Sequence, residues 1–215
     1  MEPDPPLSPR LLYPVVVVGG AASLATEISA SRLLAPYFGS STVVWANIIG
    51  LILVYLSVGY WVGGRIADRH ASPRSLGALL LGASACIAAL PFIAHPVLGV
   101  ARSGLDALSV GAVAGSFVAT LALFSVPVTL LGMVSPFAVR LALRDVSEAG
   151  TVSGRLYSLS TMGSIAGTFL PAIVTIPWAG TQRTMLGAAL LLALSAVPLL
   201  GMRAATVAAV IAGRA

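Results

Sequence analysis

Residues 75–101 read SLGALLLGASACIAALPFIAHPVLGVA, which is 27 consecutive residues without an aspartate, glutamate, lysine or arginine. A helix needs about 20 apolar residues to cross the hydrocarbon core of a bilayer, so this stretch is long enough for one crossing. Working outward from it, further stretches also lack charge, namely residues 11–26, 33–64, 107–139, 156–182 and 184–202. The pattern predicts an all-α, polytopic membrane protein with six transmembrane helices.

Acidic and turn-forming residues refine these bounds. The first charge-free stretch is short for a crossing, so its helix must carry Glu27 inside the membrane and continue to about Leu34. The stretch 107–139 exceeds one crossing but not two, and Pro127 and Pro136 predict a kinked or extended helix there. We therefore expect helices near residues 11–34, 43–66, 75–98, 110–139, 153–178 and 183–202.

The composition excludes an ordinary soluble domain. Hydrophobic residues make up 58% of the chain and charged residues only 9%, whereas a soluble domain carries about 25% charged residues. All 12 basic residues are arginine, and they are scattered beside apolar runs, which favours membrane orientation over nucleic-acid binding. The single cysteine, Cys86, excludes an internal disulfide and is best read as a small buried hydrophobe.

The arginines also predict the orientation. Six crossings that start in the cytoplasm place nine arginines inside and three outside, in agreement with the positive-inside rule. The inner set is Arg10, Arg65, Arg69, Arg74, Arg140, Arg144, Arg155, Arg203 and Arg214, and the outer set is Arg32, Arg102 and Arg183. We therefore expect an integral protein of a prokaryotic inner membrane with both termini in the cytoplasm.

The expected organisation is a single transmembrane domain. Residues 1–10 form a cytoplasmic tail, residues 11–203 hold the six helices, and residues 204–215 form a short apolar tail. Acidic residues and prolines in the first ten positions are a poor start for a signal peptide, so the first helix is expected to be retained.

Pairs of glycines four residues apart predict close helix contacts. They are Gly59/Gly63, Gly111/Gly115 and Gly163/Gly167. Small residues let helix backbones approach in a membrane, and packing within one chain is the expected use. Because the second and fifth helices both carry a pair, the sequence hints at an inverted three-plus-three repeat.

Glu27 is the most informative polar residue. An acid within a crossing costs about 2.5–3.5 kcal/mol on insertion scales. Its helical neighbours on the same face are the small residues Gly20, Ser23, Ala30 and Ser31, so that face must meet a helix or a watery cavity. Glu27 is either a cation or proton site or a hydrogen-bonded lock between helices, and we favour the first.

Other polar residues are candidates for a substrate path. Arg32 either reaches the outer headgroups or takes part in substrate binding or gating. The fifth helix carries a stripe at helical spacing, which lines an aqueous path or bonds neighbouring helices. The stripe consists of Tyr157, Thr161, Ser164 and Thr168, with Ser160 beside them. Further candidates on the second helix are Asn47, Tyr55 and Tyr60.

Enzyme chemistry has no support in the sequence. No His/Cys cluster has metal spacing, no glycine-rich loop follows a strand, and no serine, histidine and aspartate form a credible triad. We expect no catalytic site, no metal and no cofactor.

The sequence Gly64-Arg65-Ile66-Ala67-Asp68-Arg69, followed by Arg74, resembles the signature loop between the second and third helices of major facilitator superfamily transporters. The resemblance implies that Asp68 caps or pairs with a helix end and that Arg65 and Arg69 form a cytoplasmic ion-pair gate. A short charged loop also arises from topology alone. Six helices with this loop resemble one half of such a transporter.

A second resemblance covers nearly the whole chain. It is carried by the motifs LLAPYFGSS (33–41), GGRIADR (63–69), GMVSP (132–136), GRLYSLS (154–160), GSIAGTFLP (163–171) and GTQRT (180–184). With these motifs the chain resembles the membrane domain of spermidine-synthase-like fusion proteins, in which a transporter-like half is joined to a soluble aminopropyltransferase-like domain. We expect the soluble domain to be absent here, so aminopropyl transfer does not carry over.

Two functions follow as expectations. The first is a half-size transporter that forms a homodimer in the lipid bilayer and moves a small cationic or amphipathic metabolite, with a polyamine as the candidate. The alternative is a non-transporting membrane module that anchors or regulates a separately encoded, soluble spermidine-synthase-like enzyme. No nucleic acid is expected as a partner.

Overall fold

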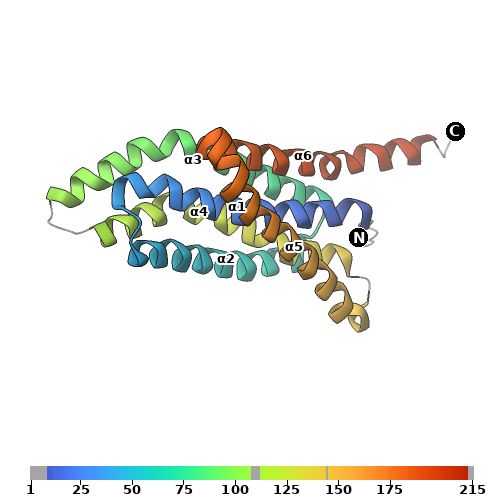
Figure 1. Cartoon of the computed structure of the whole chain (residues 1–215). Coiled ribbons are helices and arrows are strands. Elements are labelled where there is room, and N and C mark those ends of the chain that lie inside the picture. Colours follow the sequence, from blue (N-terminus) through green and yellow to red (C-terminus); the bar gives the residue numbers. More distant parts are fainter. Residues whose placement is uncertain (1–8, 108–111, 144, 213–215) are drawn as a thin grey trace.

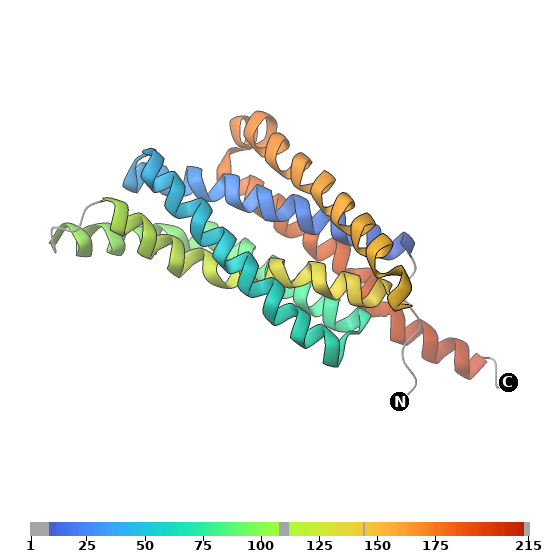
Figure 2. The same ribbon diagram turned by 90° about the horizontal axis from the view of Figure 1, so that it is seen from below.

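The computed structural model describes the backbone of residues 9–107, 112–143 and 145–212, and the side chains of residues 11–100, 113–143 and 145–201. The described chain is a bundle of long helices (Figures 1 and 2). The elements are α1 (Pro9–Phe38), α2 (Thr42–His70), α3 (Pro73–Ala107), α4 (Ala112–Ala142), a 3₁₀ turn η1 (Val146–Glu148), α5 (Ala149–Leu170), a π-helical turn η2 (Pro171–Thr175) and α6 (Ile176–Ala212).

Local capping chemistry ends one helix and starts the next. Gly39 follows α1 with φ +78°, a left-handed conformation that glycine adopts without strain. The Ser41 hydroxyl then accepts the Val44 N–H at 3.3 Å and caps α2. Between α4 and α5, the Asp145 carboxylate accepts hydrogen bonds from the Ser147 hydroxyl and N–H at 2.7 and 2.8 Å, which lowers the pKa of Asp145 from its ordinary value.

Two local irregularities mark the passage from α5 to α6. Pro171 has no N–H to donate, and the helix widens into the π-helical turn there. Gly180 then leaves helical geometry with φ 84° and ψ 164°, and the ribbon bends sharply (Figure 1). Because an L side chain at this φ is strained, a glycine suits the bend.

Five helical segments are long and apolar enough to cross a membrane. They are Leu11–Phe38, Thr42–His70, Pro73–Val100, Val113–Ala142 and Val146–Gly201. This confirms the prediction of an all-helical chain, and the length and composition of its helices fit a membrane protein. The last segment has 56 residues, or about 84 Å of helix at 1.5 Å per residue, which is far more than one crossing of a 30 Å core needs.

The helices pack in three extensive pairs, α2 with α4, α1 with α5, and α3 with α6, and α1 also contacts α4 and α6. The glycine pairs sit in the first two of these contacts. A Cβ added to Gly59 or Gly163 would overlap the backbone of Thr129 or Val17, respectively. Packing within the chain, as predicted for these two glycine pairs, is therefore confirmed, whereas Gly111 lies outside the described residues.

The two close contacts are related by a repeat. Between α2 and α4 they are Gly59–Thr129, Gly63–Met133 and Leu56–Gly132, and between α5 and α1 they are Gly163–Val17, Gly167–Ala21 and Ser160–Gly20. Each α5 residue lies 104 positions after its α2 counterpart, and each α4 residue lies 112 positions after its α1 counterpart. Since α1 and α4 run in opposite directions, as do α2 and α5 (Figure 1), the relationship is an inverted one.

Candidate functional site

A small polar chamber lies where α1, α2, α4 and α5 meet. Its volume is about 80 Å³. We call it the polar chamber and define it by its hydroxyl-bearing residues Ser23, Tyr60, Ser135, Ser160 and Ser164. In a bilayer, such a group of hydroxyls facing one space can replace water for a polar or charged ligand.

The polar chamber straddles the internal repeat. Ser23 of α1 and Ser135 of α4 are 112 residues apart, which is the spacing of the backbone contacts. Tyr60 of α2 and Ser164 of α5 are 104 residues apart, which is the other spacing. Equivalent positions of the two repeats therefore face the same space, as expected for a site at a repeat interface.

A glycine contact holds the α5 wall of the polar chamber against α1. A Cβ added to Gly20 would overlap the Ser160 carbonyl oxygen, so only glycine permits this approach. The Ser164 hydroxyl donates to the Gly20 carbonyl at 3.2 Å. This contact fixes Ser160 and Ser164 on a rigid helix backbone, as a binding site with defined geometry requires.

Glu27 lies on the α1 face that lines the polar chamber. It is one helical turn after Ser23, which lines the chamber, and its side chain is partly buried. Long side chains in a helix lean toward the N-terminus, which here is the direction of the chamber. Among the described residues, no side chain forms a hydrogen bond or ion pair with Glu27.

Arg32 belongs to a different site, at the far end of α1. With Tyr37, His95 and Gln182 it lines a pocket of about 220 Å³. The Tyr37 hydroxyl and His95 Nδ1 are 2.6 Å apart and join α1 to α3. The structure therefore separates Arg32 from the polar chamber.

Asn47 also lies apart, and its amide is already used. Its Nδ2 donates to the Val113 carbonyl at 2.9 Å and to the Ser116 hydroxyl at 3.1 Å. These bonds join α2 to α4, which is the structural use that polar residues often have between membrane helices.

The predicted α5 stripe divides between two faces. Ser160 and Ser164 line the polar chamber, whereas Tyr157 and Thr161 are exposed. The Thr161 hydroxyl donates to the Tyr157 carbonyl at 2.8 Å. Ser57 of α2, which occupies the position equivalent to Thr161, makes the same bond to Leu53 at 2.8 Å.

The charged segment after the second apolar run differs from the expected loop. Arg65, Asp68 and Arg69 lie in the last turns of α2, which continues to His70 rather than ending near residue 66. A charged residue ends an apolar stretch of sequence, but the helix can continue, because the long side chain carries its charge to the membrane surface.

The Asp68 carboxylate lies 4.0 Å from Nε of Arg140 on α4, with both side chains at least half exposed. The Arg65 guanidinium lies 3.8 Å from the Trp61 ring centroid. Arg69 is exposed. At this end a weak, exposed ion pair thus joins α2 to α4.

Sequence reasoning missed Ser135 and Arg140 as site residues. Ser135 lies in an apolar helix and Arg140 ends it, so nothing in their local pattern sets them apart. Ser135 lies 112 residues after Ser23, the same spacing as between the other equivalent residues of α1 and α4. A comparison of the two repeats could have identified Ser135 from this spacing. In the described part of the chain, no three His, Cys, Asp or Glu side chains gather as a metal site would require.

These features describe a helical chain of the apolar composition that fits a membrane protein, with a polar chamber where the related helices α1, α4, α2 and α5 meet. The chain is similar to polyamine aminopropyltransferase 2 of Ralstonia nicotianae (strain ATCC BAA-1114 / GMI1000), with 28% identity over 175 residues, which is 81% of this chain and 32% of that protein. It is equally similar to polyamine aminopropyltransferase 1 of the same organism, at 28% over 81% of this chain and 31% of that protein. The chain thus spans about a third of the length of the curated relatives it matches. No family model matches the chain, and no solved structure does.

Proposed function

We propose that the chain is a half-size, transporter-like protein that acts as a homodimer and moves a small cationic metabolite, with a polyamine as the first candidate. The observation that carries the proposal is the polar chamber at the repeat interface, with Glu27 one helical turn away on the same face. An intramembrane acid beside hydroxyl groups suits a protonated amine. The similarity to proteins named polyamine aminopropyltransferases supports the choice of polyamine.

The volume of the polar chamber limits the size of the group that it can bind. A water molecule has a share of about 30 Å³ in the liquid, so a chamber of about 80 Å³ has room for one ammonium group with its nearest methylene. In this proposal one amine end of the polyamine enters the chamber. The remaining methylenes of the polyamine lie beside α2 and α5, along the proposed substrate path.

Exposed polar residues on α2 and α5 support the homodimer. Tyr60 and Tyr157 are exposed on these two helices, and tyrosine hydroxyls that face lipid without a hydrogen-bond partner are costly. A second copy that covers this face supplies the missing wall of the path. Native mass spectrometry from mild detergent should then detect a dimer, and a monomer with retained uptake under every lipid condition would contradict this.

The proposed topology has six crossings in an inner membrane, with both termini in the cytoplasm. The bend at Gly180 divides the 56-residue segment into two crossings. The described start of α1 and end of α6 lie at one end of the bundle (Figures 1 and 2). At that end the Arg155 guanidinium donates to the Tyr13 hydroxyl at 3.1 Å, and Arg140 meets Asp68. An arginine-rich end on the cytoplasmic side agrees with the positive-inside rule.

A second candidate function follows from the names of the relatives. Both are called aminopropyltransferases, and the match covers about a third of each. In this alternative the chain anchors or regulates an aminopropyltransferase-like enzyme and moves nothing itself. It acts without catalysis in either proposal.

Uptake into proteoliposomes separates the two functions. The purified chain is reconstituted with no soluble protein, and entry of labelled spermidine is compared with that into protein-free liposomes. The transporter proposal requires uptake that saturates with spermidine concentration. Absence of uptake, together with tight binding of a purified aminopropyltransferase to the same liposomes, would favour the anchoring module.

A further inference from the structure

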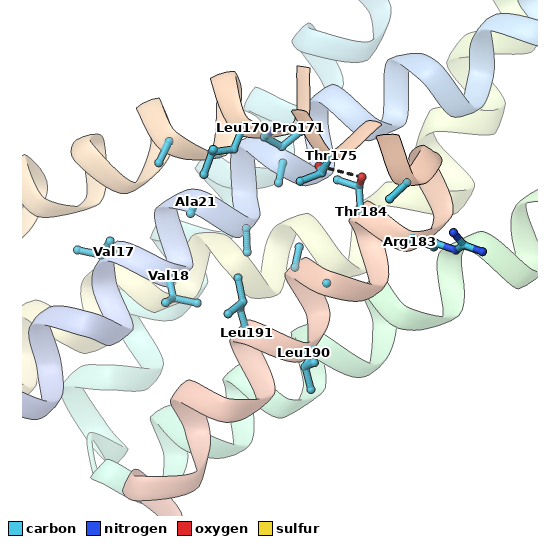
Figure 3. Close-up of a pocket in the computed structure, with 17 residues that line it drawn as sticks. Val17, Val18, Ala21, Leu170, Pro171, Thr175, Arg183, Thr184, Leu190 and Leu191 are labelled. Atoms are coloured by element: carbon cyan, nitrogen blue, oxygen red, sulfur yellow. Dashed lines mark hydrogen bonds between the residues drawn. The ribbon is translucent and has the colours of Figure 1, made fainter. Parts of the chain in front are cut away.

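A larger cavity lies on the other side of α1, between α1, α5, η2 and α6 (Figure 3). Its volume is about 480 Å³, which is within the range of about 300–1,000 Å³ for small-molecule sites. Only Thr175, Arg183 and Thr184 among its lining residues are polar. Neither Glu27 nor any hydroxyl of the polar chamber lines this cavity, so it is a separate site.

Small residues and the bend create the cavity. Ala21 and Ala25 on α1 face Ala166 on α5 and Gly187 on α6, so no large side chain fills the gap from these positions. A Cβ added at Gly187 would meet nothing within 4 Å. The wall also includes Leu residues of α5 and α6 that are more than half exposed, so the cavity is open to the membrane at its side.

The cavity has one polar end. The Thr175 and Thr184 hydroxyls are 2.9 Å apart, and the Thr184 hydroxyl is also 2.9 Å from the Gly180 carbonyl. The Thr184 hydroxyl is the donor in both contacts, so its proton is used within this group. Figure 3 shows Arg183 at the same end, with its guanidinium directed away from Thr184 and out of the cavity.

The charge at this end favours an anion. Among the described residues, nothing forms an ion pair or hydrogen bond with Arg183, and its guanidinium has five donors. Of the four acids with described side chains, Asp68, Asp145 and Glu148 lie at the opposite end of the bundle (Figure 1), and the fourth, Glu27 of α1, neither lines the cavity nor pairs with Arg183. An occupant would thus place an apolar tail inside and a negative group outside, beside Arg183.

We propose that this cavity binds one acyl chain of an anionic phospholipid, whose phosphate is held by Arg183. The α1 wall extends from Val17 to Ala25, which is about 12 Å at 1.5 Å per residue and close to the thickness of one leaflet of a 30 Å core. The tail fills space that would otherwise be a void between helices. The phosphate oxygens accept hydrogen bonds from the Arg183 guanidinium, which has no acceptor among the described residues.

Native mass spectrometry tests the proposal directly. The full chain is released from nanodiscs that contain equal amounts of phosphatidylglycerol and phosphatidylcholine with identical acyl chains. One phosphatidylglycerol should be retained per chain, with about tenfold preference over phosphatidylcholine, which corresponds to about 1.4 kcal/mol. Equal retention of the two lipids by the wild-type chain would overturn the proposal.

Two variants and two matched controls assign the site. Gly187→Leu, which places a side chain in the cavity, should abolish retention, while Gly201→Leu on the same helix, where a Cβ also has open space, should not. Arg183→Gln should remove the preference for the anionic lipid, while Arg32→Gln in the neighbouring pocket should keep it. Since Arg183 is exposed, its loss should leave the fold intact. Retention of phosphatidylglycerol by Gly187→Leu, loss of the preference in Arg32→Gln, or a lipid-free dimer that covers the cavity would each refute the assignment.

Discussion

Glu27 carries the functional proposal at the scale of a single residue. A helix lock would need a partner for the carboxylate, and none of the described side chains provides one. What surrounds it instead is a face of small residues that leads to the polar chamber. This environment is the reason for proposing that Glu27 binds the cationic ligand.

The first prediction is for Glu27→Gln. This change keeps the shape and removes the charge, so the variant should unfold at the same temperature as the wild type or a higher one, because a carboxylate in low dielectric is costly. Binding of spermidine should fall tenfold or more. Thermal unfolding and equilibrium binding measured on one sample test both statements.

The control for this variant is Glu148→Gln, which removes an exposed acid from η1 and should leave binding unchanged. If Glu27 instead belonged to a buried ion pair, its replacement would cost about 3–5 kcal/mol and the fold would suffer first. A Glu27→Gln variant that is stable and binds spermidine as well as the wild type would contradict the proposed binding role of Glu27.

At the scale of the element, close glycine contacts fix how α5 lies on α1 and how α2 lies on α4. Each contact leaves no room for a Cβ, and the two contacts occupy equivalent places in the repeats. The α5 contact also sets the position of Ser160 and Ser164, so helix packing and site geometry depend on the same residues.

The second prediction compares two glycines of α5. Gly163→Ala should lower stability by about 1–3 kcal/mol, because the new methyl overlaps the Val17 backbone and the helices must separate. Gly154→Ala should raise stability by up to about 1 kcal/mol, because its Cβ meets open space and the helix loses a flexible residue. Thermal unfolding in one detergent checks the pair, and equal melting temperatures would show that α5 does not pack on α1 in this way.

Sequence alone predicted the elements better than the site. The length of a charge-free run is a local property, and it predicted the approximate positions of the long helices. Their ends differ, because α2, α3 and α6 continue to His70, Ala107 and Ala212 and α5 ends at Leu170. The site depends on which distant residues meet. The sequence predicts Asn47 as a path residue, but its amide is bonded to α4, and Ser135 has no local signal in the sequence.

At the scale of the whole molecule, the two repeats place equivalent residues around one chamber. The equivalent contacts relate α4 to α1 and α5 to α2, and we propose that α6 repeats α3 in the same inverted way. In the proposed topology the bend at Gly180 divides the last 56-residue segment into two of those helices. The central claim is therefore that the chain crosses the membrane six times.

Cysteine accessibility tests this claim most directly. In a Cys86→Ser background, single cysteines at Ser72, Ser147 and Gly201 should react only with reagent on the cytoplasmic side. Those at Ser40 and Gln182 should react only from the outside. Reaction of Ser147 and Gly201 from opposite sides, or protection of Gln182 from both, would show that residues 146–201 cross once and would contradict the account.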